Sequence, residues 1–300
     1  MMFITASRMT DPKTVLLSWA FDPLVVLGLG IGAWWYTRAL LRLRRRGAAW
    51  PVSRSWAFFG GLAVLGFALL SPLDVYSDLL LSVHMVQHLL LTMVAPPLLL
   101  LGAPITLALR TAIPPRRASL AALLRSRTVR VVGNPVLGWT LFVGTLWITH
   151  LPAFYDAAIE HVGLHAVEHL AYVGTALLFW RPLVGRDPGP TLSYPGRLFA
   201  MFLIMPQMTF LGLAIYSSDR ALYTPYILTS PLFGTTAVGD QHLAGAIMWT
   251  SGMLFMVPAM AFVLIAWMNR DEREAARYDA RAIAAQARRE TLSAQTSDPA

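Results

Sequence analysis

The chain has 300 residues, of which 56% are hydrophobic and 13% are charged, and its mean hydropathy is +0.55. Soluble domains carry about 25% charged residues, so this composition excludes an ordinary soluble domain and indicates a membrane protein. The net charge is +8 and there is no cysteine, which excludes disulfides, thiolate metal sites and thiol relays.

Long apolar stretches recur along the chain, each close to the ~20 residues that a helix needs to cross a bilayer. We therefore predict an all-α polytopic membrane protein, a bundle of seven transmembrane helices. The first helix is expected to begin at Asp22-Pro23, because Asp is a favoured N-cap and Pro is favoured at the first helical position. The seven spans are expected near residues 23–41, 55–72, 79–102, 135–153, 160–181, 196–217 and 240–268.

These spans define a transmembrane domain over residues 1–270. The Arg-, Leu- and Ala-rich residues 116–131 predict a helix that lies on the cytoplasmic leaflet. Residues 271–290 predict a charged cytoplasmic helix, and residues 291–300 predict a disordered tail.

The distribution of Lys and Arg predicts the orientation of the bundle. Of the 24 basic residues, 21 fall in the loops and tail on one side of the predicted spans. Because cytoplasmic loops carry the excess of basic residues, the N-terminus is expected outside and the C-terminus in the cytoplasm. The positive charge thus reflects topology, and a nucleic-acid partner is not expected.

A repeated motif, H-x-V-[Q/E]-H-L, opens two of the predicted spans. Its copies are HMVQHL at 84–89 and HAVEHL at 165–170, and the last span opens with its second half, QHL, at 241–243. Residues i and i+4 share one face of a helix, so each copy presents two imidazoles on one side. The Gln or Glu flanks that face, where it can fix the tautomer of an imidazole.

The predicted topology places all seven histidines in the outer half of the membrane or at its outer edge. No water satisfies an imidazole pair at that depth, and polar groups there are usually functional. We therefore predict a metal site, for which histidine without cysteine suits copper, zinc or iron, and nearby methionines favour copper. The expected ligands are His84, His88, His165 and His169, with His150 and His242 at the rim, supported by Gln87, Glu168, Asp240 and Gln241. For His150, His161 and His242, a plain interfacial hydrogen-bonding role is an equally good interpretation.

Four blocks, in this order, resemble the CtaG family of assembly factors for caa-type cytochrome c oxidases. The blocks are HMVQHLLLTMVAPPLLLLGAP, ITHLPAFYDAA, HAVEHLAYVGTALLFWRP and DQHLAGAIMW, spread over roughly residues 70–270. A second family of copper-delivery proteins shares that name, but it has one membrane span and a cysteine motif. The positions that match the family are His84, Gln87, His88, His150, Tyr155, His165, Glu168, His169, Asp240, Gln241 and Trp249.

The resemblance implies a plasma-membrane protein, with its histidines on the periplasmic side, that serves copper to the maturing oxidase. Oxidase subunits, the lipid bilayer and a periplasmic copper donor are its expected partners, and a homodimer is compatible with the sequence. A donor whose imidazoles lie at the depth of the oxidase copper centre could pass the ion sideways by ligand exchange. Such a donor needs open coordination positions instead of a closed tetrahedral cage.

Other functions stay open at this point, although an enzyme is not expected. H-A-V-E-H at 165–169 fits the H-x-x-E-H zinc pattern, which predicts an intramembrane zinc hydrolase with Glu168 activating water. Histidines on facing helices could also clamp a haem. A scaffold for oxidase subunits would leave the paired histidines unexplained.

Overall fold

The computed structural model describes residues 18–296, with side chains as far as residue 286. The described chain is helical and contains no strand, which confirms the predicted all-α class. Residues 1–17 of the predicted domain and residues 297–300 of the predicted tail lie outside the described residues. The N-terminal half comprises α2 (Pro23–Arg45), α3 (Val52–Leu70), α4 (Pro72–Ser77), α5 (Leu81–Leu89), the π-helical turn η2 (Leu90–Val94), α6 (Ala95–Leu101), α7 (Pro104–Thr111), α8 (Pro114–Arg125) and α9 (Arg127–Val132). The C-terminal half comprises α10 (Pro135–Thr149), α11 (Pro152–Glu160), α12 (Val162–Val184), α13 (Tyr194–Tyr216), α14 (Tyr226–Thr229), the 3₁₀ turn η3 (Ser230–Phe233) and α15 (Ala237–Thr296).

Six of the described helical segments are long and apolar enough to cross a membrane, and α10 with α11 makes a seventh if that bent pair is one span. The two helices meet at 78°. Pro152 forces the preceding Leu151 into an extended conformation and so ends α10. The predicted N-cap of the first span is confirmed, because Asp22 accepts a hydrogen bond from Leu24 N at 2.7 Å.

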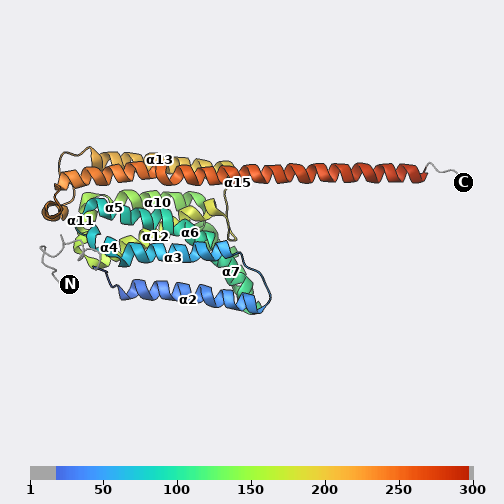
Figure 1. The fold of residues 1–300 in the computed structure, drawn as a ribbon, viewed down its shortest axis with the longest axis horizontal. Helices are drawn as coiled ribbons and strands as arrows, with labels where there is room; N and C mark the ends of the chain where they lie inside the picture. Colours follow the sequence, from blue (N-terminus) through green and yellow to red (C-terminus); the bar gives the residue numbers. More distant parts are fainter. Residues whose placement is uncertain (1–17, 297–300) are drawn as a thin grey trace.

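The helices form a bundle with α2 along one edge and the pair α13 and α15 along the other (Figure 1). These last two helices approach closely through glycine. A Cβ on Gly212 would lie 2.6 Å from Trp249 N, and a Cβ on Gly245 would lie 2.6 Å from Tyr216 N. Small residues at such positions allow the backbones of membrane helices to touch.

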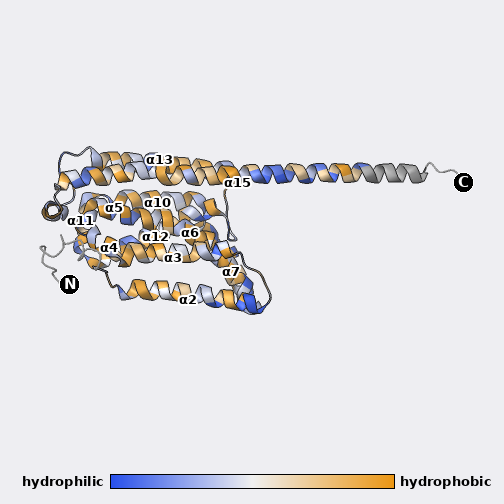
Figure 2. Ribbon diagram, in the orientation of Figure 1, coloured by the Kyte–Doolittle hydropathy of each residue, from blue (hydrophilic) through white to orange (hydrophobic). Residues whose placement is uncertain are grey.

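The predicted last span and the predicted charged helix are one continuous helix. α15 runs from the bundle far past its end, and the first part beyond the bundle is mostly hydrophilic (Figures 1 and 2). It remains helical to Thr296, so the helix continues beyond residue 290, where the sequence suggested a disordered tail.

The segments rich in Arg meet at one end of the bundle, which we call the basic end. Arg46 donates to Arg110 O at 3.1 Å, and Thr106 N donates to Asp187 Oδ1 at 2.7 Å. Arg270 of α15 lies over the ring of Tyr194 at 5.8 Å. Residues 116–131 form α8 and α9 at this end. The gathering of the basic loops at one end agrees with the predicted topology, while the side of the membrane that this end faces stays a prediction.

Candidate metal centre

The first two histidines of the motif lie on α5, whose first turn is held by a distant residue. Leu80 is the N-cap residue of this helix, and its apolar side chain cannot accept a hydrogen bond from the first turn. Asp240 at the start of α15 takes that place: Leu81 N donates to its Oδ2 at 2.6 Å, and Ser82 Oγ donates to its Oδ1 at 2.5 Å. A carboxylate suits this position because the amides at a helix N-terminus are unsatisfied and carry partial positive charge.

A π-helical turn, η2, follows α5 and shapes the far side of the histidine pair. Pro96 has no N–H, so it cannot donate to the carbonyl of Thr92. Trp180 of α12 supplies the missing donor, and its Nε1 lies 2.9 Å from Thr92 O. Such π-helical turns are frequent at functional sites. The turn therefore ties α5 to α12, the helix that carries the second copy of the motif.

Four imidazoles, two from each copy, form a quadrilateral between α5 and α12. The ring centroids are 4.0 Å apart for His84 and His88, and 4.3 Å apart for His165 and His169. Across the helices, His84 lies 5.7 Å from His165, and His88 lies 6.2 Å from His169. The pair on α5 is buried and the pair on α12 is half-buried. The structure thus brings together two histidine pairs separated by about 80 residues of sequence.

His150 is a fifth member of this group. It lies at the end of α10, beside the bend, and its ring is 6.0 Å from that of His88. Its Nδ1 bonds to Leu146 O at 2.7 Å and is therefore the protonated nitrogen, which leaves the lone pair of Nε2 free. This is the arrangement of a metal-binding imidazole oriented by a backbone carbonyl.

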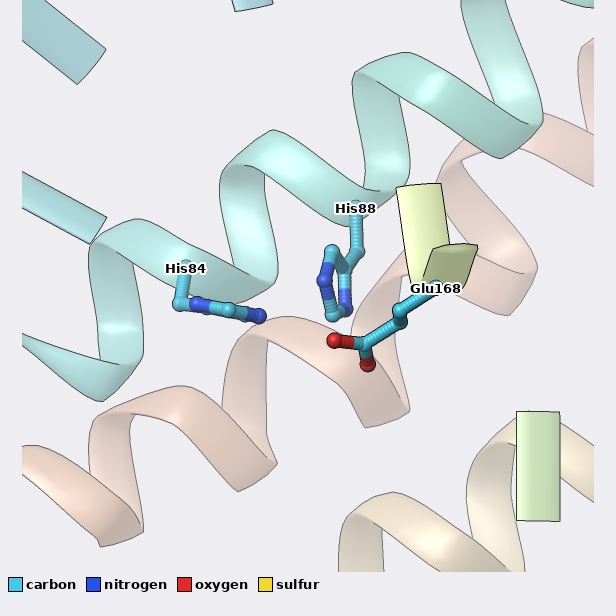
Figure 3. A group of neighbouring side chains, drawn as sticks. All are labelled: His84, His88 and Glu168. Carbon is cyan, nitrogen blue, oxygen red and sulfur yellow. The ribbon is translucent and has the colours of Figure 1, made fainter. Parts of the chain in front are cut away.

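Glu168 lies next to the buried pair, between the two histidines of its own motif copy in sequence. Figure 3 shows the carboxylate of Glu168 and the rings of His84 and His88 pointing toward one another. The ligand atoms of these three buried residues all lie within 4.8 Å of one another. Metal–nitrogen bonds of ~2.0 Å place opposite ligands about 4 Å apart, so the group needs only a small contraction to hold an ion.

The cluster contains many buried polar atoms without a hydrogen-bond partner. Buried nitrogen and oxygen atoms are normally paired, and an unpaired buried carboxylate is especially costly. A cation among these atoms would supply the missing interactions. The unpaired buried atoms of the cluster are Nε2 of His84, His150, His165 and His169, both ring nitrogens of His88, and Oε1 of Glu168.

Buried tyrosines surround the histidines and orient them. Tyr226 OH lies 3.4 Å from His84 Nδ1 and donates to Ser77 O at 2.9 Å. Tyr223 OH donates to His150 O at 3.0 Å, and Tyr172 OH hydrogen-bonds to Thr149. These three tyrosines were not predicted from the sequence. Tyr172 could have been found, because it lies four residues after Glu168 on the same helix face.

A small, partly enclosed cavity adjoins the cluster, and three methionines are among its lining residues. Its volume is about 10 Å³, which is enough for one small ion or water. His88 and His150 also line it. The three methionines that line it are Met85 of α5, Met208 of α13 and Met248 of α15, all of them buried. Thioether and imidazole ligands together are soft donors, which suit Cu(I) better than Mg²⁺, Ca²⁺ or Mn²⁺.

Three other predicted residues have partners outside the cluster. Gln87 donates to Ala68 O at 2.8 Å and to Asp74 Oδ1 at 2.7 Å, which ties α5 to α3 and α4. The amide of Gln241 bonds to the loop that follows α13, including Leu222 N at 2.7 Å. His242 Nε2 lies 3.3 Å from Ser218 O of that loop, and its ring packs on Tyr216. Gln87 and Asp240 thus attach α5 to α3, α4 and α15, while Gln241 and His242 attach α15 to the loop after α13.

The chain is similar to one known protein family and to several curated proteins. The family model described as cytochrome c oxidase caa3 assembly factor matches residues 34–270, a region that contains the whole cluster. Uncharacterised proteins of Mycobacterium bovis and Mycobacterium tuberculosis are each 33% identical over 88% of this chain, and one of Mycobacterium leprae is 32% identical over 87%. The chain spans about two-fifths of the length of these curated relatives (41–42%). No solved structure matches the chain.

Proposed function

The chain belongs to the cytochrome c oxidase caa3 assembly factor family, and from that premise we propose that it holds copper for the maturing oxidase. The observation that carries the proposal is the convergence of unpaired ligand atoms from α5, α10 and α12. The ligands would be His84, His88 and Glu168, with His150, His165 and His169 as alternates. We leave His242 out of the ligand set because its ring nitrogen bonds to a loop carbonyl away from the cluster.

Copper is favoured over zinc by the three methionines that line the small cavity together with His88 and His150. Soft thioethers bind Cu(I) well, whereas zinc prefers thiolate, imidazole and carboxylate ligands. An ion that leaves the buried pair could be stabilised by these methionines while its coordination changes. A site with several alternate ligands exchanges its cargo more readily than a closed cage does.

The second histidine pair offers a lateral route for the ion. His165 and His169 are half-buried, and their neighbours Val167 and Leu170 are 58% and 72% exposed on the outer face of α12. That apolar face would lie in lipid, where a membrane-embedded acceptor could approach it. Copper would then pass from imidazole to imidazole without crossing water. We place this exchange on the periplasmic side of the plasma membrane, as the distribution of basic residues predicts.

Metal analysis of the purified protein tests the proposal. We expect near-stoichiometric copper after incubation with Cu(I), and a loss of at least about tenfold in affinity for His84→Ala/His88→Ala. The matched control is His161→Ala/His242→Ala, which should retain copper because His161 is the exposed N-cap residue of α12 and His242 bonds to the loop after α13. Equal retention by both double variants, with both folded, would overturn the proposal.

An intramembrane zinc hydrolase is the alternative that one observation favours, because Glu168 lies beside two imidazoles as a general base would. Glu168→Gln separates the two functions. A hydrolase should keep zinc and lose turnover, whereas a copper carrier should bind its ion less tightly. A haem between these helices is not favoured, since the cavity beside His88 and His150 is far smaller than a porphyrin.

A further inference from the structure

A second, much larger cavity lies at the basic end, away from the histidines. α15 packs on α13 along the bundle and on α5 near the histidine cluster. Toward the basic end, a groove of about 1030 Å³ separates the pair α13 and α15 from α6 and α12. We call it the basal groove.

The inner walls of the basal groove are apolar. They come from four helices. Apart from the charged residues of the mouth, the polar side chains that line the groove are Tyr194, Asn269 and Trp180, whose indole already bonds to Thr92 O. Phe262 and Ile265 of α15 line the groove and are 73% and 54% exposed. Walls of this kind suit hydrocarbon chains, which need no hydrogen-bond partner.

The mouth of the basal groove is strongly basic. Five arginines and a single acidic residue line it, and that residue, Glu274, is paired with Arg270 at 2.6 Å. Arg197 and Arg270 both lie over the ring of Tyr194, at 5.0 Å and 5.8 Å, which holds the two guanidinium groups close together. The arginines of the mouth are Arg186, Arg197, Arg270, Arg273 and Arg277.

We propose that the basal groove binds an anionic phospholipid, with its phosphodiester at the arginines and its acyl chains along the apolar walls. The basic mouth complements the charge of the headgroup, and the apolar walls complement the acyl chains. Guanidinium groups bind phosphate oxygens in paired hydrogen bonds, and basic pockets between membrane helices on the cytoplasmic side select anionic headgroups. A transmembrane helix of another protein would satisfy the walls but would leave this concentration of positive charge unpaired. The lipid would also fill the space between α15 and α12. This proposal does not depend on copper binding.

Native mass spectrometry of the full-length protein tests the site. The protein is delipidated in neutral detergent and offered equal amounts of phosphatidylglycerol and phosphatidylcholine with identical chains. We expect the wild type to retain the anionic lipid about tenfold more than the neutral lipid. Arg273→Gln/Arg277→Gln should bring this ratio close to one, because both side chains are exposed and serve only the mouth. Arg116→Gln/Arg117→Gln on α8 removes the same charge elsewhere and should leave the ratio unchanged.

Two further arms separate a lipid from other occupants. Ala266→Phe narrows the apolar part and should lower retention of the lipid without touching an arginine. Excess glycerophosphate, which has the headgroup phosphate but no chains, should fail to displace the lipid. Equal retention of the two lipids by the wild type, an equal effect of the α8 variant, or full displacement by glycerophosphate would each overturn the proposal. The first outcome would point to a groove that seats a helix or bulk lipid.

Discussion

Asp240 could either support a metal ligand or cap α5, and replacing it tests which of these two roles it has. From the sequence, Asp240 is expected to support a metal ligand, whereas in the structure it caps α5, 158 positions away from Ser82. The residue is 3% exposed, and its carboxylate accepts from Leu81 N and Ser82 Oγ. Asp240→Ala leaves these donors buried and unpaired.

The size of the effect follows from those two bonds. Hydrogen bonds to a charged group contribute about 1.5–3 kcal/mol, and an orphaned buried donor costs a similar amount. We expect Asp240→Ala to lower the free energy of unfolding by about 3 kcal/mol, or roughly 6–12 °C in the melting temperature. Asp240→Asn keeps one acceptor for Leu81 N and should cost about 1 kcal/mol, because it loses the charge and the oxygen that accepts from Ser82 Oγ.

Thermal unfolding in detergent, followed by helical circular dichroism, measures both variants, and copper content is determined in parallel. Asp279→Asn, an exposed acid further along α15, is the matched control and should change stability by less than about 0.5 kcal/mol. If Asp240→Asn melts like the wild type but loses its copper, the carboxylate acts on the ion and the capping role is refuted. An unchanged melting temperature for Asp240→Ala would refute it as well.

Two other predictions concern the packing and the pH dependence of the fold. Gly212→Ala should destabilise the bundle by about 1–3 kcal/mol, because the added Cβ meets the backbone of α15. Gly28→Ala has open space around the added Cβ and should be neutral or stabilising. Equal melting temperatures for the two variants would contradict the close approach of α13 and α15. Burial raises the pKa of Asp74, which lies on α4 between two spans, to about 6. The unfolded chain releases this proton near pH 4, so the free energy of unfolding should fall as pH rises from about 4 to about 6 and stay level above that. Asp74→Asn should remove this part of the pH profile, and a profile identical to that of the wild type would contradict the assignment.

Several features of this protein follow from local sequence. Twenty-residue apolar stretches define membrane helices because the bilayer leaves backbone groups no other partner. The i, i+4 spacing places His84 with His88, and His165 with His169, on single helix faces, which is a property of each helix alone. Asp22-Pro23 starts a helix for an equally local reason.

The composition of the site was decided by the tertiary structure. Which helix faces meet depends on crossing contacts, such as the Trp180 bond to η2 and the glycine contact between α13 and α15. Those contacts bring Glu168 to the pair on α5, and His150 joins because Pro152 ends α10 there. QHL at 241–243 repeats half of the motif, yet its histidine lies outside the cluster, because α15 turns Asp240 instead toward α5. Periodicity along one helix places a side chain on a face, but only packing determines what that face meets.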